Sequence, residues 1–144
     1  MNSAESQLTS ELQELYLESK EKLSDILFLE DESRFFQKLF EKALLSTTTE
    51  ENFWGLGFVN SRLVELRERL VKLKILLSAQ QDSIENVLRD IGTNIEMSLL
   101  DQDILICSEI KALHTLDRSV RKELYAHVEQ VMADKKAGHL FDTR

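Results

Sequence analysis

No proline occurs anywhere in the 144-residue sequence, and only four residues are glycine. At average usage a chain of this length would carry about seven prolines and about ten glycines. Because both residues punctuate turns and interrupt regular elements, their scarcity predicts few turns and long elements. With 42% hydrophobic and 31% charged residues, the chain has neither a disordered nor a membrane-protein composition. Long elements in such a chain are helices, so we predict an all-α fold.

Three long helices are predicted, at residues 6–45, 59–91 and 94–136, with a loose tail at 138–144. The middle one has the clearest pattern, because its seam steps by four and three from Val59 to Ile91 and only Gln80 on it is polar. Short connections make consecutive helices antiparallel neighbours. We therefore expect residues 1–144 to form one domain, an elongated up-down-up antiparallel bundle of three helices with coiled-coil-like packing.

Two places leave this expectation open. The bundle has four helices if the first helix breaks near Asp31 or the third breaks near Asp101–Asp103. Before the second helix, Gly55 and Gly57 interrupt an aromatic segment, and we interpret residues 53–58 as a short irregular or weakly helical corner. The aromatic side chains of this corner either staple the end of the bundle or anchor a partner, and we favour stapling.

The signatures of enzymes are missing from the sequence. It contains no glycine-rich phosphate loop, nucleotide fingerprint or nucleophile elbow, and no Glu-x-x-His pair of the kind that holds metals in helical bundles. We therefore predict a non-enzymatic protein with no catalytic residue, cofactor or metal. The alternative is a ligand- or metal-binding bundle, whose donors would be the seam carboxylates and one histidine: Glu30, Asp103, Glu109 and His114.

Gln80 is the candidate for a polar layer inside the bundle. In the antiparallel register it lies level with Asp103–Ile104 of the third helix and with Leu23–Ser24 of the first. A buried amide can set the register or the oligomeric state of packed helices. The alternative, which we favour at this point, is that the long side chain of Gln80 only reaches solvent at the edge of the seam.

The first helix carries a second apolar line besides its core stripe. Leu17, Phe28 and Phe35 align within about 20° at helical periodicity, and Leu39 joins them at about 40°. Such a line on the outer face would be unusual for a bare monomer. It indicates either an interface, with another copy of the chain or with a different protein, or a kink near Asp31 that turns the later residues inward.

The balance of charge narrows the set of partners. The formal net charge is −8, which opposes binding to nucleic acid and to anionic lipid surfaces. The single cysteine, Cys107, fits a reducing compartment, and we recognise neither a secretory signal nor a run long enough to cross a membrane. We expect a cytoplasmic protein that binds a protein partner or itself, and neither nucleic acid nor a membrane.

Residues 14–20 and 27–32 of the first helix, Glu-Leu-Tyr-Leu-Glu-Ser-Lys and Leu-Phe-Leu-Glu-Asp-Glu, resemble small helical proteins of Bacteroidetes-type bacteria. The resemblance covers the first helix alone. It implies a bacterial origin and brings no activity, cofactor or functional residue with it.

Overall fold

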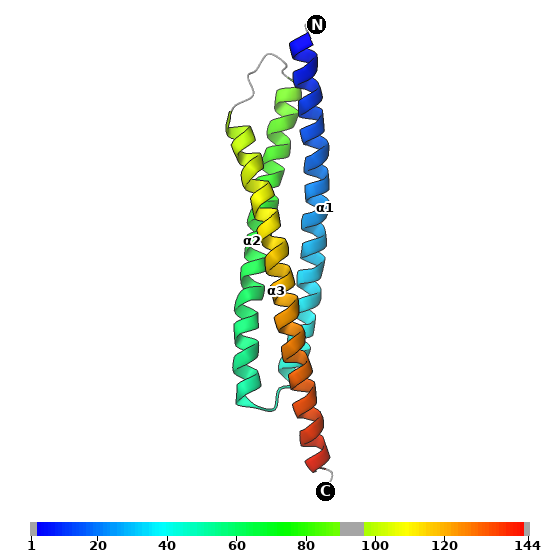
Figure 1. Cartoon of the computed structure of the whole chain (residues 1–144), viewed down its shortest axis with the longest axis vertical. Coiled ribbons are helices and arrows are strands. Elements are labelled where there is room, and N and C mark those ends of the chain that lie inside the picture. Colours follow the sequence, from blue (N-terminus) through cyan, green and yellow to red (C-terminus); the bar gives the residue numbers. More distant parts are fainter. Residues whose placement is uncertain (1–2, 90–96, 143–144) are drawn as a thin grey trace. The chain divides into compact units, whose positions relative to one another are not determined.

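The computed structural model describes residues 3–89 and 97–142 and consists of three α-helices (Figure 1). They are α1 (Ser3–Leu45), α2 (Glu50–Arg89) and α3 (Met97–Asp142), and the described residues contain no strand. The predicted all-α class is confirmed. Neither α1 at Asp31 nor α3 at Asp101–Asp103 is broken, so the four-helix alternative is wrong for the part of the chain described.

The helices contribute to two compact units, each of which takes one stretch of every helix. Unit 1 comprises Met1–Phe28 and Leu70–Ala112, and unit 2 comprises Leu29–Arg69 and Leu113–Arg144. In unit 1, Tyr16 of α1 donates a hydrogen bond to Glu85 of α2 over 3.0 Å, and Lys22 of α1 pairs with Asp103 of α3 over 2.6 Å. All three helices are therefore in contact within this unit.

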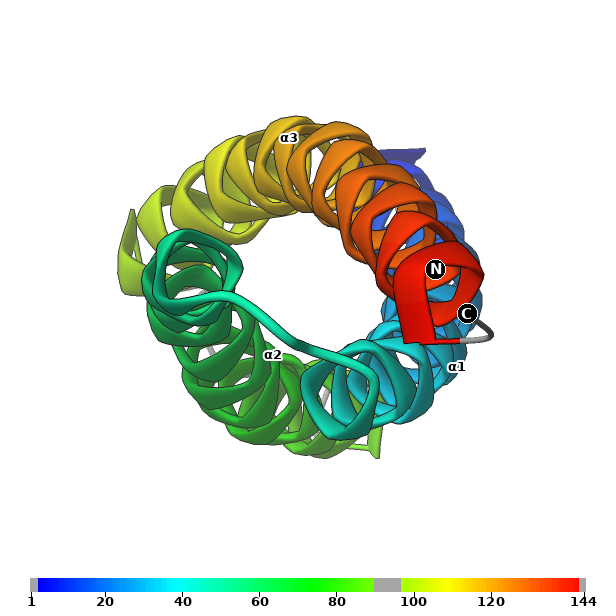
Figure 2. The same cartoon turned by 90° about the horizontal axis from the view of Figure 1, so that it is seen from below.

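In unit 2, α2 and α3 run in opposite directions. Asn52 of α2 donates a hydrogen bond to Asp134 of α3 over 2.7 Å, and Arg62 pairs with Glu123 over 2.5 Å, so residue numbers fall on one helix as they rise on the other. The predicted antiparallel up-down-up order of the helices is confirmed. Figure 2 shows the α1–α2 connection at the near end, with the helices of this unit around a common interior.

The predicted seam of α2 is buried at every step from Val59 to Ile84. Burial of one such leucine or isoleucine side chain contributes about 1.5–3 kcal/mol to folding, so a seam of this length is a main source of stability in both units. Near the end of α1, Ala43 is buried and its neighbour Leu44 is exposed.

The connection between α1 and α2 is shorter than predicted. The amide of Asn52 donates a hydrogen bond to the Thr49 hydroxyl over 3.2 Å, so Thr49 caps the start of α2. The helix begins at Glu50 and not at 59, so residues 53–58 are helical and the irregular form of the predicted corner is wrong. Two glycines cost a helix only about 1 kcal/mol each, and the good cap and long buried seam outweigh this cost.

The end of α3 also differs from the prediction. The helix continues through Gly138 to Asp142, so the expected tail at 138–144 is wrong for residues 138–142. A glycine stops a helix when it adopts a left-handed conformation, and no described glycine has a positive φ. The predicted end of the second helix at 91 and start of the third at 94 lie outside the described residues.

Candidate functional site

The candidate interface on α1 is exposed along most of its length. The side chains of Leu17 and Phe28, in unit 1, are 62% and 55% exposed, and that of Phe35, in unit 2, is 54% exposed. Leu39 is half-buried. Because α1 is unbroken and Phe28 and Phe35 remain exposed, the alternative in which a kink near Asp31 turns the later residues inward is wrong.

Phe35 is held in place by its neighbour in the sequence. Its ring centroid lies 6.2 Å from that of the buried Phe36, at an interplanar angle of 59°. This tilted pair leaves the outer face of Phe35 uncovered while its edge is supported by the core. The arrangement presents a ring whose position is already ordered, which lowers the entropy lost when a partner covers it.

A second exposed aromatic group occupies the first turns of α2. Phe53, Trp54 and Phe58 are all exposed, and Phe53 and Trp54 contact each other edge to face with ring centroids 5.9 Å apart. The favoured interpretation, in which these rings staple the end of the bundle, is therefore wrong. The reason is that α2 begins before them, which fixes their directions by helical geometry and turns them away from the core.

Gln80 forms a buried polar layer in unit 1. Its side chain is 0% exposed, and its Nε2 donates a hydrogen bond to Asp103 Oδ1 over 3.1 Å. Lys22 Nζ donates to the same oxygen over 2.6 Å. The predicted level of Gln80 and Asp103 is confirmed, and the alternative in which Gln80 reaches solvent is wrong, because the layer joins residues from all three helices.

The electrostatics of this layer are set by one carboxylate and one ammonium group. Burial lowers the pKa of Lys22, but the hydrogen bond and charge of Asp103, with a smaller contribution from Cys107, outweigh burial and raise it. Lys22 therefore stays charged and neutralises Asp103. Within this layer, Gln80 Oε1 is buried and accepts no hydrogen bond from the described residues.

A second polar layer, in unit 2, has no counterpart in the sequence-based predictions. Arg121 of α3 donates to Glu32 of α1 and, over 3.1 Å, to the buried Asp117. Burial, and then the hydrogen bond and charge of Glu32, raise the pKa of Asp117 to about 7, while Arg121 and Arg118 oppose the shift. Two carboxyl groups thus share one guanidinium, and Asp117 keeps its proton to near neutral pH.

A signal for this second layer was present in the sequence. Asp117 stands four residues after Leu113 and three before Val120, which is a seam position occupied by a charged residue. Glu32 likewise stands three residues after Leu29 and four before Phe36, but its approach to Asp117 depends on how α1 and α3 pack.

The donors of the alternative ligand or metal site are divided between the two units. Asp103 and Glu109 belong to unit 1, whereas Glu30 and His114 belong to unit 2. Within residues 3–89 and 97–142, no three histidine, cysteine, aspartate or glutamate side chains come together in a way that could hold a metal ion.

Comparison with protein-family models, with curated proteins and with solved structures yields no match. None of the described helices combines the length and the apolar character that crossing a membrane requires. The function has to be argued from the surfaces and polar layers of the chain itself.

Proposed function

We propose that this chain is a non-enzymatic helical-bundle module that associates with a protein surface, either a second copy of itself or a different protein, through the exposed apolar line of α1. The observation that carries the proposal is the exposure of Leu17, Phe28 and Phe35 along one unbroken helix. A fully buried aromatic side chain covers about 150–250 Å², so each of these phenylalanines, a little over half exposed, offers roughly half of that area to a partner. Buried aromatic residues supply much of the energy of protein interfaces.

The apolar anchors of the line are interspersed with polar residues. Glu21 and Ser24 fall on the same face of α1 as Leu17 and Phe28, and Arg34 lies beside it. Charged groups around apolar anchors set the orientation of a partner.

Solution mass measured by light scattering after size exclusion, over a range of concentrations, tests the proposal. We expect a mass of about twice 16.7 kDa or more at high concentration. The double variant Phe28→Asp/Phe35→Asp should shift the chain to 16.7 kDa with unchanged helicity, because both rings are exposed and their loss opens no cavity.

Ile104→Asp/Leu105→Asp is the matched control. Both are apolar side chains of α3, 66% and 63% exposed, so their replacement makes the same change of charge away from α1. The control should keep the mass of the unmodified chain. Self-association through α1 is contradicted if the double variant keeps the higher mass, or if it loses its helicity, since the rings would then be core residues.

A further inference from the structure

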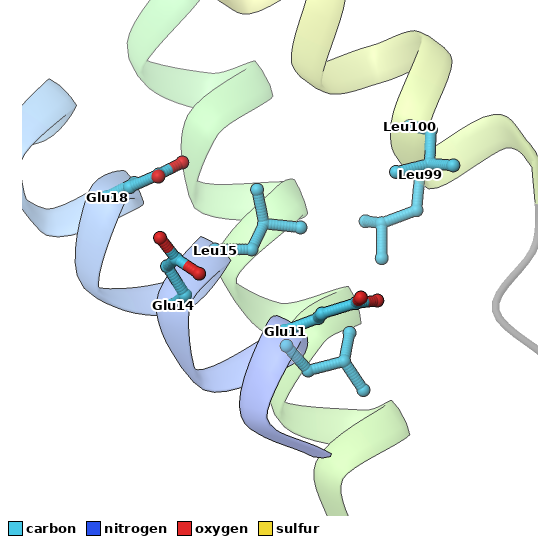
Figure 3. A pocket seen from close by; sticks show the side chains of 7 residues that line it. Glu11, Glu14, Leu15, Glu18, Leu99 and Leu100 are labelled. Carbon is cyan, nitrogen blue, oxygen red and sulfur yellow. The ribbon is translucent and has the colours of Figure 1, made fainter. Parts of the chain in front are cut away.

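An acidic-rimmed pocket lies in unit 1 between the beginning of α1 and the first turns of α3 (Figure 3). Its volume is about 280 Å³, enough for one or two aliphatic side chains. Leucines form the apolar part of its lining, namely Leu12, Leu15, Leu99 and Leu100. Figure 3 shows Leu15 and Leu99 on opposite sides of the space, with glutamate side chains projecting from α1 around it.

The rim of the pocket carries three carboxylates. Glu11, Glu14 and Glu18 are spaced by three and four residues, so they follow one line of α1, and all three are exposed. No salt bridge to a basic side chain is found for them within the described part of the chain. An apolar floor edged by uncompensated negative charge favours an occupant that is apolar at its centre and basic at its sides.

The chain itself presents such a surface on α2. Val71 and Ile75 are one helical turn apart on one face and are 57% and 66% exposed. At 100° per residue, Lys72 and Lys74 fall on either side of this apolar pair, about 80° from its centre. Both lysines are exposed, and all four residues belong to unit 1.

We propose that the pocket between α1 and α3 is a docking site for a second copy of this chain, which inserts Val71 and Ile75 of its α2 between the leucines while Lys72 and Lys74 pair with the glutamate rim. Two observations on separate elements support this occupant: the pocket has a leucine lining and the stripe is apolar, and the glutamate line beside the pocket is opposite in charge to the lysines beside the stripe. The surface differs from the apolar line of α1, so the inference goes beyond the proposed function.

Reversal of charge provides the test. Glu14→Lys/Glu18→Lys places positive charge opposite the native lysines, and Lys72→Glu/Lys74→Glu places negative charge opposite the native rim. We expect each variant alone to show a dissociation constant for self-association that is at least about tenfold higher than that of the unmodified chain. An equimolar mixture of the two should regain association, because the reversed stripe of one then faces the reversed rim of the other.

The matched control is Glu41→Lys/Glu129→Lys. It makes the same change of net charge at exposed acidic positions of α1 and α3, away from the apolar line of α1 and outside the pocket lining. The control should associate more strongly than the pocket variant, which separates a local effect of the rim from a general effect of net charge. Far-UV circular dichroism of every variant checks that the helices are intact.

The outcomes distinguish this inference from the proposed function. The inference is overturned if the mixture does not associate, if the control weakens association as much as the pocket variant, or if the unmodified chain is a monomer at every concentration. Association that survives reversal of the rim but is lost in Phe28→Asp/Phe35→Asp overturns the inference and supports the α1 line. Association that is lost on reversal of the rim but survives in Phe28→Asp/Phe35→Asp supports the pocket and contradicts self-association through α1.

Discussion

Gly55 and Gly57 both lie within the first three turns of α2, yet their surroundings differ. A Cβ added at Gly57 meets nothing within 4 Å, whereas one added at Gly55 would stand 2.6 Å from Cε1 of His127 on α3. Gly55 therefore lets the imidazole of His127 approach the backbone of α2. Gly57 has no such role and only lowers the helical propensity of the segment.

This difference predicts that alanine changes the free energy of unfolding differently at the two positions. Gly57→Ala should raise the free energy of unfolding by about 0.5–1 kcal/mol, because alanine loses less conformational entropy in a helix. Gly55→Ala should raise the free energy of unfolding by less, or lower it, because the His127 ring has to move. Urea unfolding followed by circular dichroism measures both.

His127→Ala supplies the control for this pair. In that background the obstacle to a Cβ at position 55 is gone, so Gly55→Ala should then stabilise the chain as much as Gly57→Ala does. An equal gain from the two alanines in the unmodified chain would contradict the contact between Gly55 and His127.

At the scale of elements, the Gln80–Asp103–Lys22 layer is the point in unit 1 where all three helices meet through polar groups. Its members are unequal. Asp103 accepts hydrogen bonds from both partners, while Gln80 keeps one buried oxygen without a donor. Removing a buried polar group lowers the stability strongly only when its hydrogen-bond partners are left unsatisfied. The same substitution should therefore have different effects on stability at Asp103 and at Gln80.

Asp103→Leu should lower the free energy of unfolding by about 1–3 kcal/mol, because it leaves the half-buried ammonium of Lys22 and the amide of Gln80 without an acceptor. Gln80→Leu should change it much less, since it removes an unpaired oxygen and adds apolar contact while the Lys22–Asp103 pair remains. Chemical unfolding of both variants gives the comparison.

Asp101→Leu, at an exposed position on the same helix, is the reference for this experiment. Its free energy of unfolding should lie within about 0.5 kcal/mol of that of the unmodified chain. Equal losses from Asp103→Leu and Gln80→Leu would show that Asp103 is not the centre of the layer.

The presence of the long helices could be predicted from local sequence patterns, whereas their boundaries could not. The seam from Val59 to Ile84 could be read directly, because periodicity reports which face is apolar whatever packs against it. The start of α2 at Glu50 could not, because the decision between a helical and an irregular aromatic segment depends on the cap at Thr49 and on the contact of Gly55 with His127.

For the whole molecule, the Asp117–Glu32–Arg121 layer links stability to pH. The pKa of Asp117 is raised from 3.8 to about 7 in the folded chain, so between these values the folded state binds more protons than the unfolded state. The free energy of unfolding therefore falls as the pH rises from about 4 to about 7. The full penalty, at most about 4 kcal/mol for a shift of this size, is present above pH 7.

Asp117→Asn tests this linkage. The amide carries no charge, so the variant should show a flatter stability profile between pH 5 and 8.5 and should be more stable than the unmodified chain at the upper end. Glu32→Gln should flatten the profile in part, because it removes the carboxylate that adds to the effect of burial on Asp117. Thermal unfolding at a series of pH values measures the slope, and a slope unchanged by both substitutions would contradict the raised pKa of Asp117.

As with the fold, some residues of the candidate sites could be predicted from the sequence and others could not. The outer position of Leu17, Phe28 and Phe35 could be predicted, because their spacing placed them opposite the core stripe on one helix. The acidic pocket and the Glu32–Asp117 pair could not, because each brings together residues about 85 positions apart in the sequence, and the register between α1 and α3 decides which of them meet.

The sequence by itself determined the all-α class, the faces of the helices and the level of Gln80 with Asp103, because these depend on local periodicity and on short connections. Only the tertiary structure decided that Gln80 is buried, that the aromatic side chains of α2 point outward and that Asp117 shares Arg121 with Glu32. The physical reason is that burial and pairing are properties of two or three packed helices at once, whereas periodicity is a property of one.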